Sequence, residues 1–345
     1  MASPPIGRVL ITGGCGFLGQ HLLAHLVEPL SAGALAGVDV LDLRPPAVAL
    51  FDFDTNAAIR RLPNVDIRDY EAIPPAFAGV DCVIHLAGLV SFAWRDRDAL
   101  HGVNVGGTAN VVRAVREHGV RRFIHVSSVA ALGYGDDPAR PIDEDYEFDW
   151  SIARRVGKFY MLTKHLADLE VSRIERDVPC VTLYPGLMFG PGDTTNSARL
   201  IEAIGRGKVP FNMPGGTNIV DVRDIARGIA SILLQPDVTG HYLLSGWNLT
   251  FCEVNAIIAR QLGVQAPRRM LGRWTRPFLV PVLRAVERIG RRTELTADQL
   301  DSAYLYRYFD HSRAKQRLGW EPRIGFEQMI QDTITWMRAD GRLEE

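Results

Sequence analysis

The sequence predicts an α/β fold, a doubly wound parallel sheet with a smaller C-terminal cap. Through the first half of the chain, short apolar runs alternate with longer stretches that have helical spacing. Each crossover between parallel strands places a helix on one face of the sheet, which explains this alternation. After residue 184, loops rich in glycine and proline separate shorter elements, which indicates a change of architecture.

The predicted sheet is supplied by short runs of β-branched and other apolar residues. The expected strands are 8–12, 37–42, 65–67, 80–87, 122–127 and 179–184, and the expected helices are 17–28, 95–118 and 150–176. We assign residues 1–184 to the sheet domain and residues 185–345 mainly to the cap, with some segments returning to the sheet. Ligands of open α/β sheets bind at the carboxyl edge of the strands, so the cap is expected to bind a substrate there.

Composition and charge exclude several classes of protein. Apolar residues make up 47 % of the 345-residue chain and charged residues 23 %, as in soluble globular proteins. The net charge of −1 and the lack of a zinc-finger or basic-helix motif argue against nucleic acid as a partner. The N-terminus lacks the apolar region of a signal peptide, and no apolar run approaches the roughly 20 residues of a membrane span. We therefore expect a soluble, cytoplasmic protein.

The spacing of the cysteines gives no sign of a metal site. They lie far apart and form no CxxC pair, at Cys15, Cys82, Cys180 and Cys252. This usage fits a reducing compartment, and we expect no bound metal.

The turn TGGCGFLG has two interpretations. Gly13, Gly16 and Gly19 form GxxGxxG after a strand and before a helix, so they either turn the chain or let the backbone approach a pyrophosphate. Asp42 ends the second predicted strand, where Rossmann folds place a carboxylate that binds the adenosine ribose. The two signals together favour a dinucleotide. Because a carboxylate repels a 2′-phosphate, NAD is favoured over NADP, although Arg44 weakens that preference.

Three polar residues are candidates for catalysis. Tyr160 and Lys164 are four residues apart in a predicted helix and therefore share a face. A nearby ammonium favours the phenolate, although the pKa of a phenol is ordinarily about 10. Ser128 follows the strand expected at 122–127, which places its hydroxyl at the same edge of the sheet. A chance pair on one helix face is the alternative, and Ser128 favours the catalytic interpretation.

Several segments together resemble a known family. In order, they are TGGCGFLG, Asp42, HLAG at 85–88, VNVGGT at 103–108, SSVAALG, YMLTK and PGLMFGPGD. From residue 8 to about residue 230 the chain resembles the extended short-chain dehydrogenase/reductase superfamily. The resemblance implies that Tyr160 is the general acid/base, that Lys164 binds the nicotinamide ribose and depresses the tyrosine pKa, and that Ser128 orients the reacting oxygen. One departure is Tyr184, which stands where an arginine often precedes the proline.

The resemblance also implies cofactor contacts along the sheet edge. Asp66 and Ile67 would border the adenine, Ala87 and Gly88 the central part of NAD, and the loop 185–187 the nicotinamide. The full set of expected cofactor-binding residues is Gly13, Gly16, Phe17, Leu18, Gly19, Asp42, Arg44, Asp66, Ile67, Leu86, Ala87, Gly88, Asn104, Tyr160, Lys164, Pro185, Gly186 and Leu187. In this superfamily the helices matching 95–118 and 150–176 pair across a two-fold axis, which implies a homodimer.

The substrate class is argued from two further places in the sequence. Sugar-nucleotide enzymes of the superfamily usually have an arginine for the diphosphate at the position of Thr217. Residues 267–292 are instead similar to the 3β-hydroxysteroid dehydrogenase group. This favours an NAD-dependent oxidoreductase that interconverts a secondary alcohol and a ketone on an apolar, sterol-like or 3-oxoacyl-like substrate. A sugar-nucleotide epimerase or dehydratase and a non-catalytic NAD-binding regulator are the alternatives.

Two segments are expected to border the substrate. Residues 267–292 combine an apolar face with arginines, which predicts a lid helix or, as an alternative, a helix on a membrane surface. Pro277 and Pro281 interrupt the helix and favour the lid. Residues 135–150 are strongly acidic and predict a solvated loop that reaches over the site.

Overall fold

The computed structural model describes residues 6–151, 153, 157–291, 293 and 295–343, and its largest element is a seven-stranded parallel sheet. In the order β10-β6-β5-β4-β1-β2-β3, the strands are Gly240–Leu244, Cys180–Pro185, Arg122–Val126, Val80–His85, Ile6–Thr12, Leu35–Asp42 and Ile59–Pro63. The chain moves outward from β1 to β3 and then crosses back to β4 on the other side of β1. This reversal creates a crevice at the carboxyl ends of β1 and β4, where open α/β sheets bind ligands.

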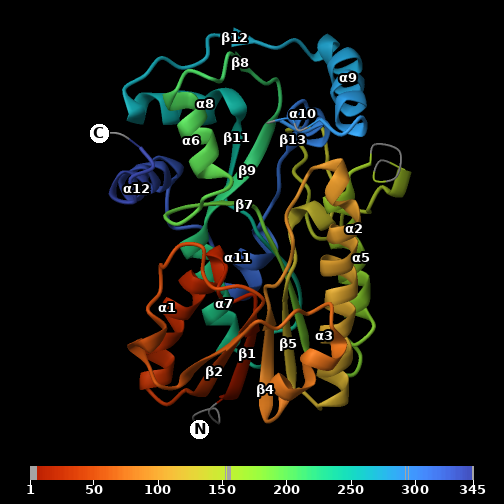
Figure 1. The fold of residues 1–345 in the computed structure, drawn as a ribbon, viewed down its shortest axis with the longest axis vertical. Coiled ribbons are helices and arrows are strands. Elements are labelled where there is room, and N and C mark those ends of the chain that lie inside the picture. Colours follow the sequence, from red (N-terminus) through yellow and green to blue (C-terminus); the bar gives the residue numbers. More distant parts are fainter. Residues whose placement is uncertain (1–5, 152, 154–156, 292, 294, 344–345) are drawn as a thin grey trace.

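Helices cover both faces of this sheet (Figure 1). The two faces are visible in β1, where Val9 and Ile11 pack in one apolar core while Leu10 packs in the other. The first core contains α1 Phe17–Ser31, α7 Val222–Leu233 and α11 Ser312–Leu318, and the second contains α3 Thr108–Glu117 and α5 Phe159–Ser172. The predicted doubly wound α/β fold is therefore confirmed.

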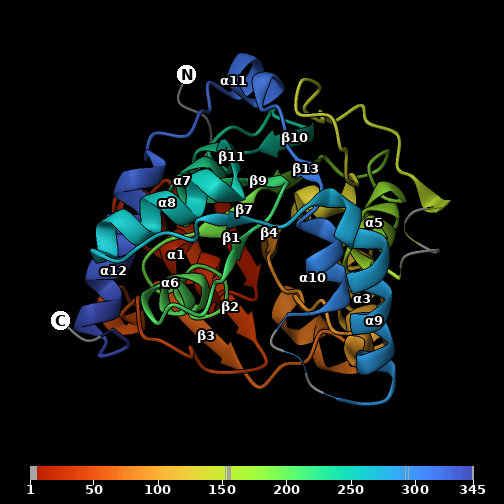
Figure 2. The ribbon, with the colours of Figure 1, turned by 90° about the horizontal axis from the view of Figure 1, so that it is seen from above.

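The remaining C-terminal elements lie beyond the carboxyl ends of the large sheet (Figures 1 and 2). A second sheet has β9 Gly216–Asp221 at its centre, paired with β7 Leu187–Phe189, β11 Trp247–Thr250 and β13 Tyr306–Arg307. The other elements are β8 Phe211–Asn212 with β12 Arg269–Met270, and the helices α6 Ser197–Gly205, α8 Phe251–Leu262, α9 Arg276–Arg288, α10 Ala297–Ser302 and α12 Phe326–Ala339. From the same half of the chain, β10, α7 and α11 belong to the large sheet.

The predicted third strand is wrong. Residues 65–67 form no strand, and the third strand is β3, Ile59–Pro63. This strand lies at the edge of the sheet with β2 as its neighbour, and Arg60 and Arg61 are exposed. Because an exposed edge strand needs no apolar run, residues 59–63 show no pattern that predicts a strand. Ile67, which suggested the strand at 65–67, is instead buried in the loop that follows β3.

Two predicted helices are shorter or less regular than expected. The stretch 95–118 consists of a 3-10 turn at Trp94–Asp96, then α2 Arg97–Leu100, a π-helical turn at His101–Gly107, and α3. The stretch 150–176 contains α5, which begins at Phe159 and ends at Ser172. Just before α5, Gly157 has a φ of 67°, which no right-handed helix accommodates. Residues 152 and 154–156 of this prediction lie outside the described residues.

The acidic segment 135–150 is attached to the fold more firmly than a solvated loop. Ile142 forms an isolated parallel bridge with Phe309, near the end of the chain. Glu144 Oε1 accepts a hydrogen bond of 2.7 Å from the backbone N–H of Leu243 in the edge strand β10. The stretch 136–141, by contrast, is exposed. The prediction of a solvated loop therefore holds for most of the segment, and it is wrong for Ile142 and Glu144, which attach the loop to the rest of the fold.

Helix α9 covers less of the molecule than the lid interpretation suggests. Val280 is its one buried residue, whereas Phe278 is 65 % exposed and Val282 is 63 % exposed. The helix packs against α10, and Arg288 lies 4.8 Å from the centre of the Trp94 ring. Within the described part of the chain, no helix has the length and apolar character needed to cross a bilayer.

Candidate active site

The glycine turn after β1 brings the start of α1 against the end of β4. Gly13 has a φ of 74°, and a Cβ at this position would lie 2.7 Å from both the Cα and the nitrogen of Ala87. Gly16 is the extended residue that precedes α1, and a Cβ at Gly19 would lie 2.5 Å from the Cα of Gly14. Among the described residues, no side chain caps α1, and its first turn contains no acid. The first amides of α1 are therefore suited to bind an anion.

Asp42 is fixed directly beside this turn. Its Oδ2 accepts a hydrogen bond of 3.0 Å from the backbone N–H of Cys15, and its Oδ1 accepts one of 3.1 Å from that of Arg44. Each carboxylate oxygen retains a lone pair, so the group can also accept from a ribose hydroxyl. A dinucleotide fits the combination of the glycine turn, the uncapped start of α1 and the Asp42 carboxylate. Arg44 takes part through its backbone N–H, which holds that carboxylate in place.

The other residues expected to contact the adenine and the middle of the cofactor occupy the same edge. The Asp66 carboxylate binds Arg68 at 2.6 Å, and Ile67 is buried beside Gly107. Leu86 donates a backbone hydrogen bond of 3.0 Å to Thr12, and Ala87 lies against Gly13. These positions agree with the expected arrangement in space, and their contacts to a cofactor remain predictions.

Asn104 lies beside the loop that follows β4, and its contact with the cofactor remains a prediction. It is 2 % exposed, in the π-helical turn. Its Oδ1 accepts from the Leu89 N–H at 2.8 Å, and its Nδ2 donates to the Leu89 carbonyl at 3.0 Å and to Thr163 Oγ1 at 3.2 Å. The side chain thus ties the loop after β4, including Gly88, to α5. Its side chain therefore helps to position this loop beside α5.

The loop after β6 completes the edge of the crevice. Pro185 is the last residue of β6, and the Gly186 N–H donates a hydrogen bond of 3.2 Å to the Leu244 carbonyl. A Cβ at Gly186 would collide with Asn218 Oδ1 of β9. Leu187 begins β7, which pairs with β9. The loop therefore joins the large sheet to the cap at the place predicted for the nicotinamide.

Ser128, Tyr160 and Lys164 come together at this edge. Ser128 follows β5, and its Oγ accepts a hydrogen bond of 3.2 Å from the Ala130 N–H. The Ser128 side chain is close enough to Tyr160 to lower the pKa of its phenol. One turn further along α5, Lys164 Nζ donates to the Val126 carbonyl at 3.3 Å. The ring edge of Phe92 packs on Tyr160, with 5.5 Å between the ring centres. Sequence reasoning missed Phe92, because its role comes from a loop conformation.

Burial is the main influence on the pKa values of both Tyr160 and Lys164. Burial raises the pKa of Tyr160 to about 12, although the Ser128 side chain opposes this shift. Burial lowers the pKa of Lys164, and the nearby Asp168 carboxylate raises it. Burial is the largest influence on the pKa of Tyr160 in this structure, and the expected depression of that pKa by Lys164 remains a prediction. At neutral pH the Tyr160 phenol is a proton donor, held next to a buried amine.

A buried polar network extends from Asp168 to the protein surface. Asp168 accepts a hydrogen bond of 3.1 Å from His125 Nε2 and is also hydrogen-bonded to Tyr184. The Tyr184 hydroxyl lies 3.0 Å from His241 Nδ1, and His241 Nε2 lies 3.2 Å from Glu175 Oε1. Tyr184 thus fills the place of the arginine that the resemblance leads one to expect. Asp168 was absent from the predicted site, although its spacing of four residues from Lys164 was a signal.

Replacing Glu175 with glutamine is expected to lower the pKa of His241. The hydrogen bond to Glu175 raises this pKa, although burial opposes it. A raised folded-state pKa adds stability that is complete below the unfolded value of about 6.5 and is lost as the pH rises through the folded value. Glu175→Gln should remove that part of the pH dependence. NMR titration of His241 and denaturant unfolding between acidic and mildly basic pH measure both effects, and an unchanged His241 pKa would contradict the assignment.

Replacing Gly13 with alanine is expected to weaken both folding and NAD binding. The variant carries left-handed backbone strain of about 1–2 kcal/mol. It also forces its methyl group against the Ala87 backbone, with an overpacking cost of about 1–3 kcal/mol. Gly33→Ala is the matched control, because Gly33 has a φ of 72° but nothing within 4 Å of the added Cβ. Urea unfolding and NAD titration should separate the two variants, and equal losses would argue against the close approach of Ala87.

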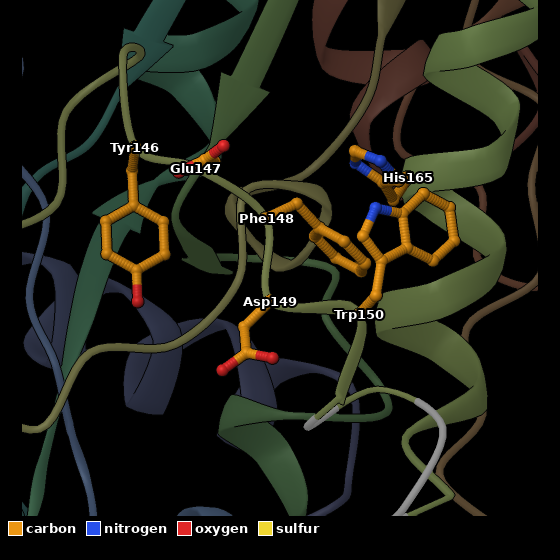
Figure 3. A pocket seen from close by; sticks show the side chains of 6 residues that line it. All are labelled: Tyr146, Glu147, Phe148, Asp149, Trp150 and His165. Carbon is orange, nitrogen blue, oxygen red and sulfur yellow. The ribbon is translucent and has the colours of Figure 1, made fainter.

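A surface pocket beside α5 lies outside this site. It has a volume of about 590 Å³ and is lined by His165 and by Tyr146, Glu147, Phe148, Asp149 and Trp150. Figure 3 shows the rings of Phe148 and Trp150 next to His165. His165 stacks on Phe148 at 3.7 Å and lies 3.1 Å from the Ala131 carbonyl. Within the described residues, no group of three metal-ligating side chains converges there or elsewhere.

A parallel sheet with a glycine cradle, together with serine, tyrosine and lysine at its carboxyl edge, defines an enzyme of the extended short-chain dehydrogenase/reductase class. The chain belongs to the NAD dependent epimerase/dehydratase family, whose model matches residues 9–244. It is accordingly an NAD-dependent oxidoreductase of that family.

Individual relatives cover most of the chain. It is 26 % identical to a putative dihydroflavonol 4-reductase from Synechocystis, over 96 % of this chain and 94 % of the relative. It is 30 % identical to the 2-alkyl-3-oxoalkanoate reductase of Stenotrophomonas maltophilia, over 76 % and 77 %. It is 27 % identical to the bovine (Bos taurus) decarboxylating sterol-4-alpha-carboxylate 3-dehydrogenase, over 96 % and 92 %. The crystal structure of gox2253 aligns with a TM-score of 0.78 at 27 % identity, over 98 % of this chain and 99 % of that chain.

Proposed function

We propose that the protein interconverts a secondary alcohol and a ketone on an apolar substrate, using NAD and a site formed by Ser128, Tyr160 and Lys164. The observation that carries this proposal is that Ser128 and Tyr160 are neighbours at the carboxyl edge of the sheet, with Lys164 one turn along the helix that carries Tyr160. The printed names of three relatives, a dihydroflavonol reductase, an oxoalkanoate reductase and a sterol dehydrogenase, support an apolar alcohol or ketone.

Several groups of this chain would hold the cofactor. Gly13 and Gly16 leave room for its pyrophosphate, the first amides of α1 face that anion, and Asp42 accepts from the adenosine ribose. When bound, NAD would accept a hydride from the alcohol carbon or supply one to the ketone carbon. The protein contributes position and proton transfer.

Proton transfer would be the task of Tyr160. In the reductive direction its Oη, protonated at neutral pH, gives its proton to the substrate oxygen as that oxygen gains negative charge. In the oxidative direction the same oxygen takes the alcohol proton. Ser128 offers a second hydrogen bond to the reacting oxygen. Lys164 would stabilise the tyrosinate, and Asp168 helps to keep that amine protonated against the effect of burial.

A sugar-nucleotide epimerase or dehydratase remains the second candidate because of one observation. The position of Thr217 has no arginine, but Arg307 Nη2 donates a hydrogen bond of 3.2 Å to Thr217 Oγ1 from the neighbouring strand β13. A guanidinium therefore lies at the place where an anion-binding arginine was judged to be missing. The regulator hypothesis is disfavoured by the complete set of reactive side chains.

A substrate panel separates these functions. The protein is incubated with NAD and 3-hydroxysteroids or 3-hydroxy acids, and then with UDP-sugars, while the absorbance of reduced cofactor is followed. We expect net NADH with members of the first panel. An isomerised sugar without net NADH would replace the proposal with the epimerase, and silence with every compound in both directions would favour the regulator.

The expected homodimer is also a proposal. Helix α5 carries an exposed Leu169, 42 % accessible, on the helix that pairs across the two-fold axis in the superfamily. An exposed leucine on such a helix supports a subunit contact. Sedimentation of the wild type and of a Leu169→Glu variant tests it, and a monomeric wild type would contradict it.

A further inference from the structure

Arg307 is a guanidinium without a counter-ion in the cap. It lies in β13, where Nη2 donates to Thr217 Oγ1 and the guanidinium carbon lies 5.5 Å from the centre of the Tyr134 ring. In the part of the chain that the structure describes, no carboxylate forms an ion pair with Arg307, and its buried Nε has no hydrogen-bond partner. Burying an N–H donor without an acceptor costs free energy, unless a ligand supplies the acceptor.

The charges nearby already balance one another without Arg307. Lys158 Nζ lies 2.7 Å from Asp298 Oδ1 and 3.1 Å from Asp301 Oδ2. Arg276 lies 2.9 Å from the other oxygen of Asp301. Two cations therefore neutralise two carboxylates, which leaves the Arg307 charge in excess. An anion that enters this region would find one uncompensated guanidinium.

The position of Arg307 relates it to the catalytic residues. The guanidinium of Arg307 lies against the ring of Tyr134 and lowers the pKa of its phenol, although burial raises that pKa more strongly. The same Tyr134 packs with Leu305 in the apolar cluster that borders Tyr160. One aromatic side chain therefore separates the guanidinium from the neighbourhood of the reacting hydroxyl, and Leu305 brings β13 to the same side. A substrate that reaches Tyr160 along this cluster would place its more distant end near Arg307.

We propose that Arg307 binds a carboxylate on the substrate, so that the substrate is an apolar hydroxy or oxo acid whose acid group is free. This inference rests on the proposed alcohol–ketone chemistry and adds the anchoring group to it. A planar guanidinium can donate two N–H groups side by side, in the geometry that a carboxylate accepts bidentately. The apolar cluster at Tyr134 and Leu305 supplies the surface for the carbon chain.

The test compares an acid with its ester in a direct binding measurement. NAD-loaded protein is titrated calorimetrically with 3-hydroxydecanoate and with methyl 3-hydroxydecanoate. We expect the acid to bind about 10- to 100-fold more tightly than the ester, as a charge-assisted hydrogen bond to a partly buried guanidinium allows. Arg307→Gln should remove this difference by weakening binding of the acid alone, and Arg307→Lys should retain part of it, because it keeps the charge without the bidentate geometry.

Controls distinguish ligand binding from a structural role. Arg268→Gln, an exposed cap arginine, should leave the preference for the acid unchanged. Without ligand, Arg307→Gln should unfold at no lower temperature than the wild type, because it removes an uncompensated charge. Equal binding of acid and ester by the wild type would overturn the inference, as would a loss of UDP binding in Arg307→Gln with unchanged binding of the acid.

These results are independent of turnover. If the acid is preferred through Arg307 but no NADH forms with any hydroxy acid, the proposed reaction fails while the anion site stands. If NADH forms equally well from acid and ester at equal KM, the reaction stands and the carboxylate site fails.

Discussion

Replacing Tyr160 with phenylalanine is expected to reduce kcat by about 10²- to 10⁴-fold, the usual contribution of general acid–base catalysis. The variant loses the hydroxyl that lies near Ser128 and that would exchange a proton with the substrate oxygen. Affinity for NAD should change little, because the glycine cradle and Asp42 are untouched. Steady-state kinetics with the substrate identified in the panel, together with NAD titration, provide the measurement.

Tyr242→Phe is the matched control for this variant. Tyr242 is 9 % exposed, and its hydroxyl donates a hydrogen bond of 2.8 Å to the Thr239 carbonyl, at the edge strand β10. Tyr242→Phe removes a hydrogen-bonded phenol hydroxyl that lies outside the site, so turnover should stay near that of the wild type. Retained turnover in Tyr160→Phe would falsify the catalytic assignment.

Replacing Lys158 with methionine is expected to destabilise the protein by about 3–5 kcal/mol, because it leaves buried carboxylates without their cation. Lys158 is fully buried and binds both Asp298 and Asp301. Burial raises the pKa of Asp301, but Lys158 and Arg276 outweigh it and hold that pKa below its ordinary value. Asp301 therefore adds stability above pH about 4 that is lost as the pH falls through its folded-state pKa. Urea unfolding near neutral pH measures the loss in Lys158→Met.

A surface ion pair provides the comparison for this prediction. Arg260 and Glu327 are joined at 2.6 Å, but both side chains are more than 60 % exposed. Glu327→Gln should therefore cost at most about 1 kcal/mol. If Lys158→Met costs no more than Glu327→Gln, the buried cluster does not hold the cap against α5. Adding Asp298→Asn to Lys158→Met should restore part of the loss, since it neutralises one of the abandoned carboxylates.

Much of the fold could be predicted because its strands are buried on both faces. In β1 the buried residues Val9, Leu10 and Ile11 form a continuous apolar run, and the glycine turn and Asp42 follow at the places that a Rossmann fold gives them. β3 escaped prediction because one of its sides has no neighbouring strand, so polar residues are tolerated there. The π-helical turn at His101–Gly107 has no local sequence signal, and its hydrogen bonds through Asn104 involve residues far apart in the chain.

The candidate site could be predicted where one helix carries its parts. Tyr160 and Lys164 share a helix, and Ser128 ends a strand, so periodicity alone related them. The network of Asp168 with His125 and Tyr184 joins three separate elements, and no spacing along the chain predicts it. Arg307 was missed for the same reason, because it lies 90 residues beyond Thr217 and reaches it through pairing of β13 with β9.

The attachment of segment 135–150 has a consequence for protein engineering. Glu144 accepts a hydrogen bond from the backbone N–H of Leu243 in the edge strand β10. Without this bond, the N–H could pair with a strand from another molecule. Ile142 meanwhile joins the C-terminal region at Phe309. A peptide tag or a fluorescent reporter inserted at 137–140 would enter exposed backbone and leave both attachments intact. The same insertion a few residues later would uncover the sheet edge and favour aggregation.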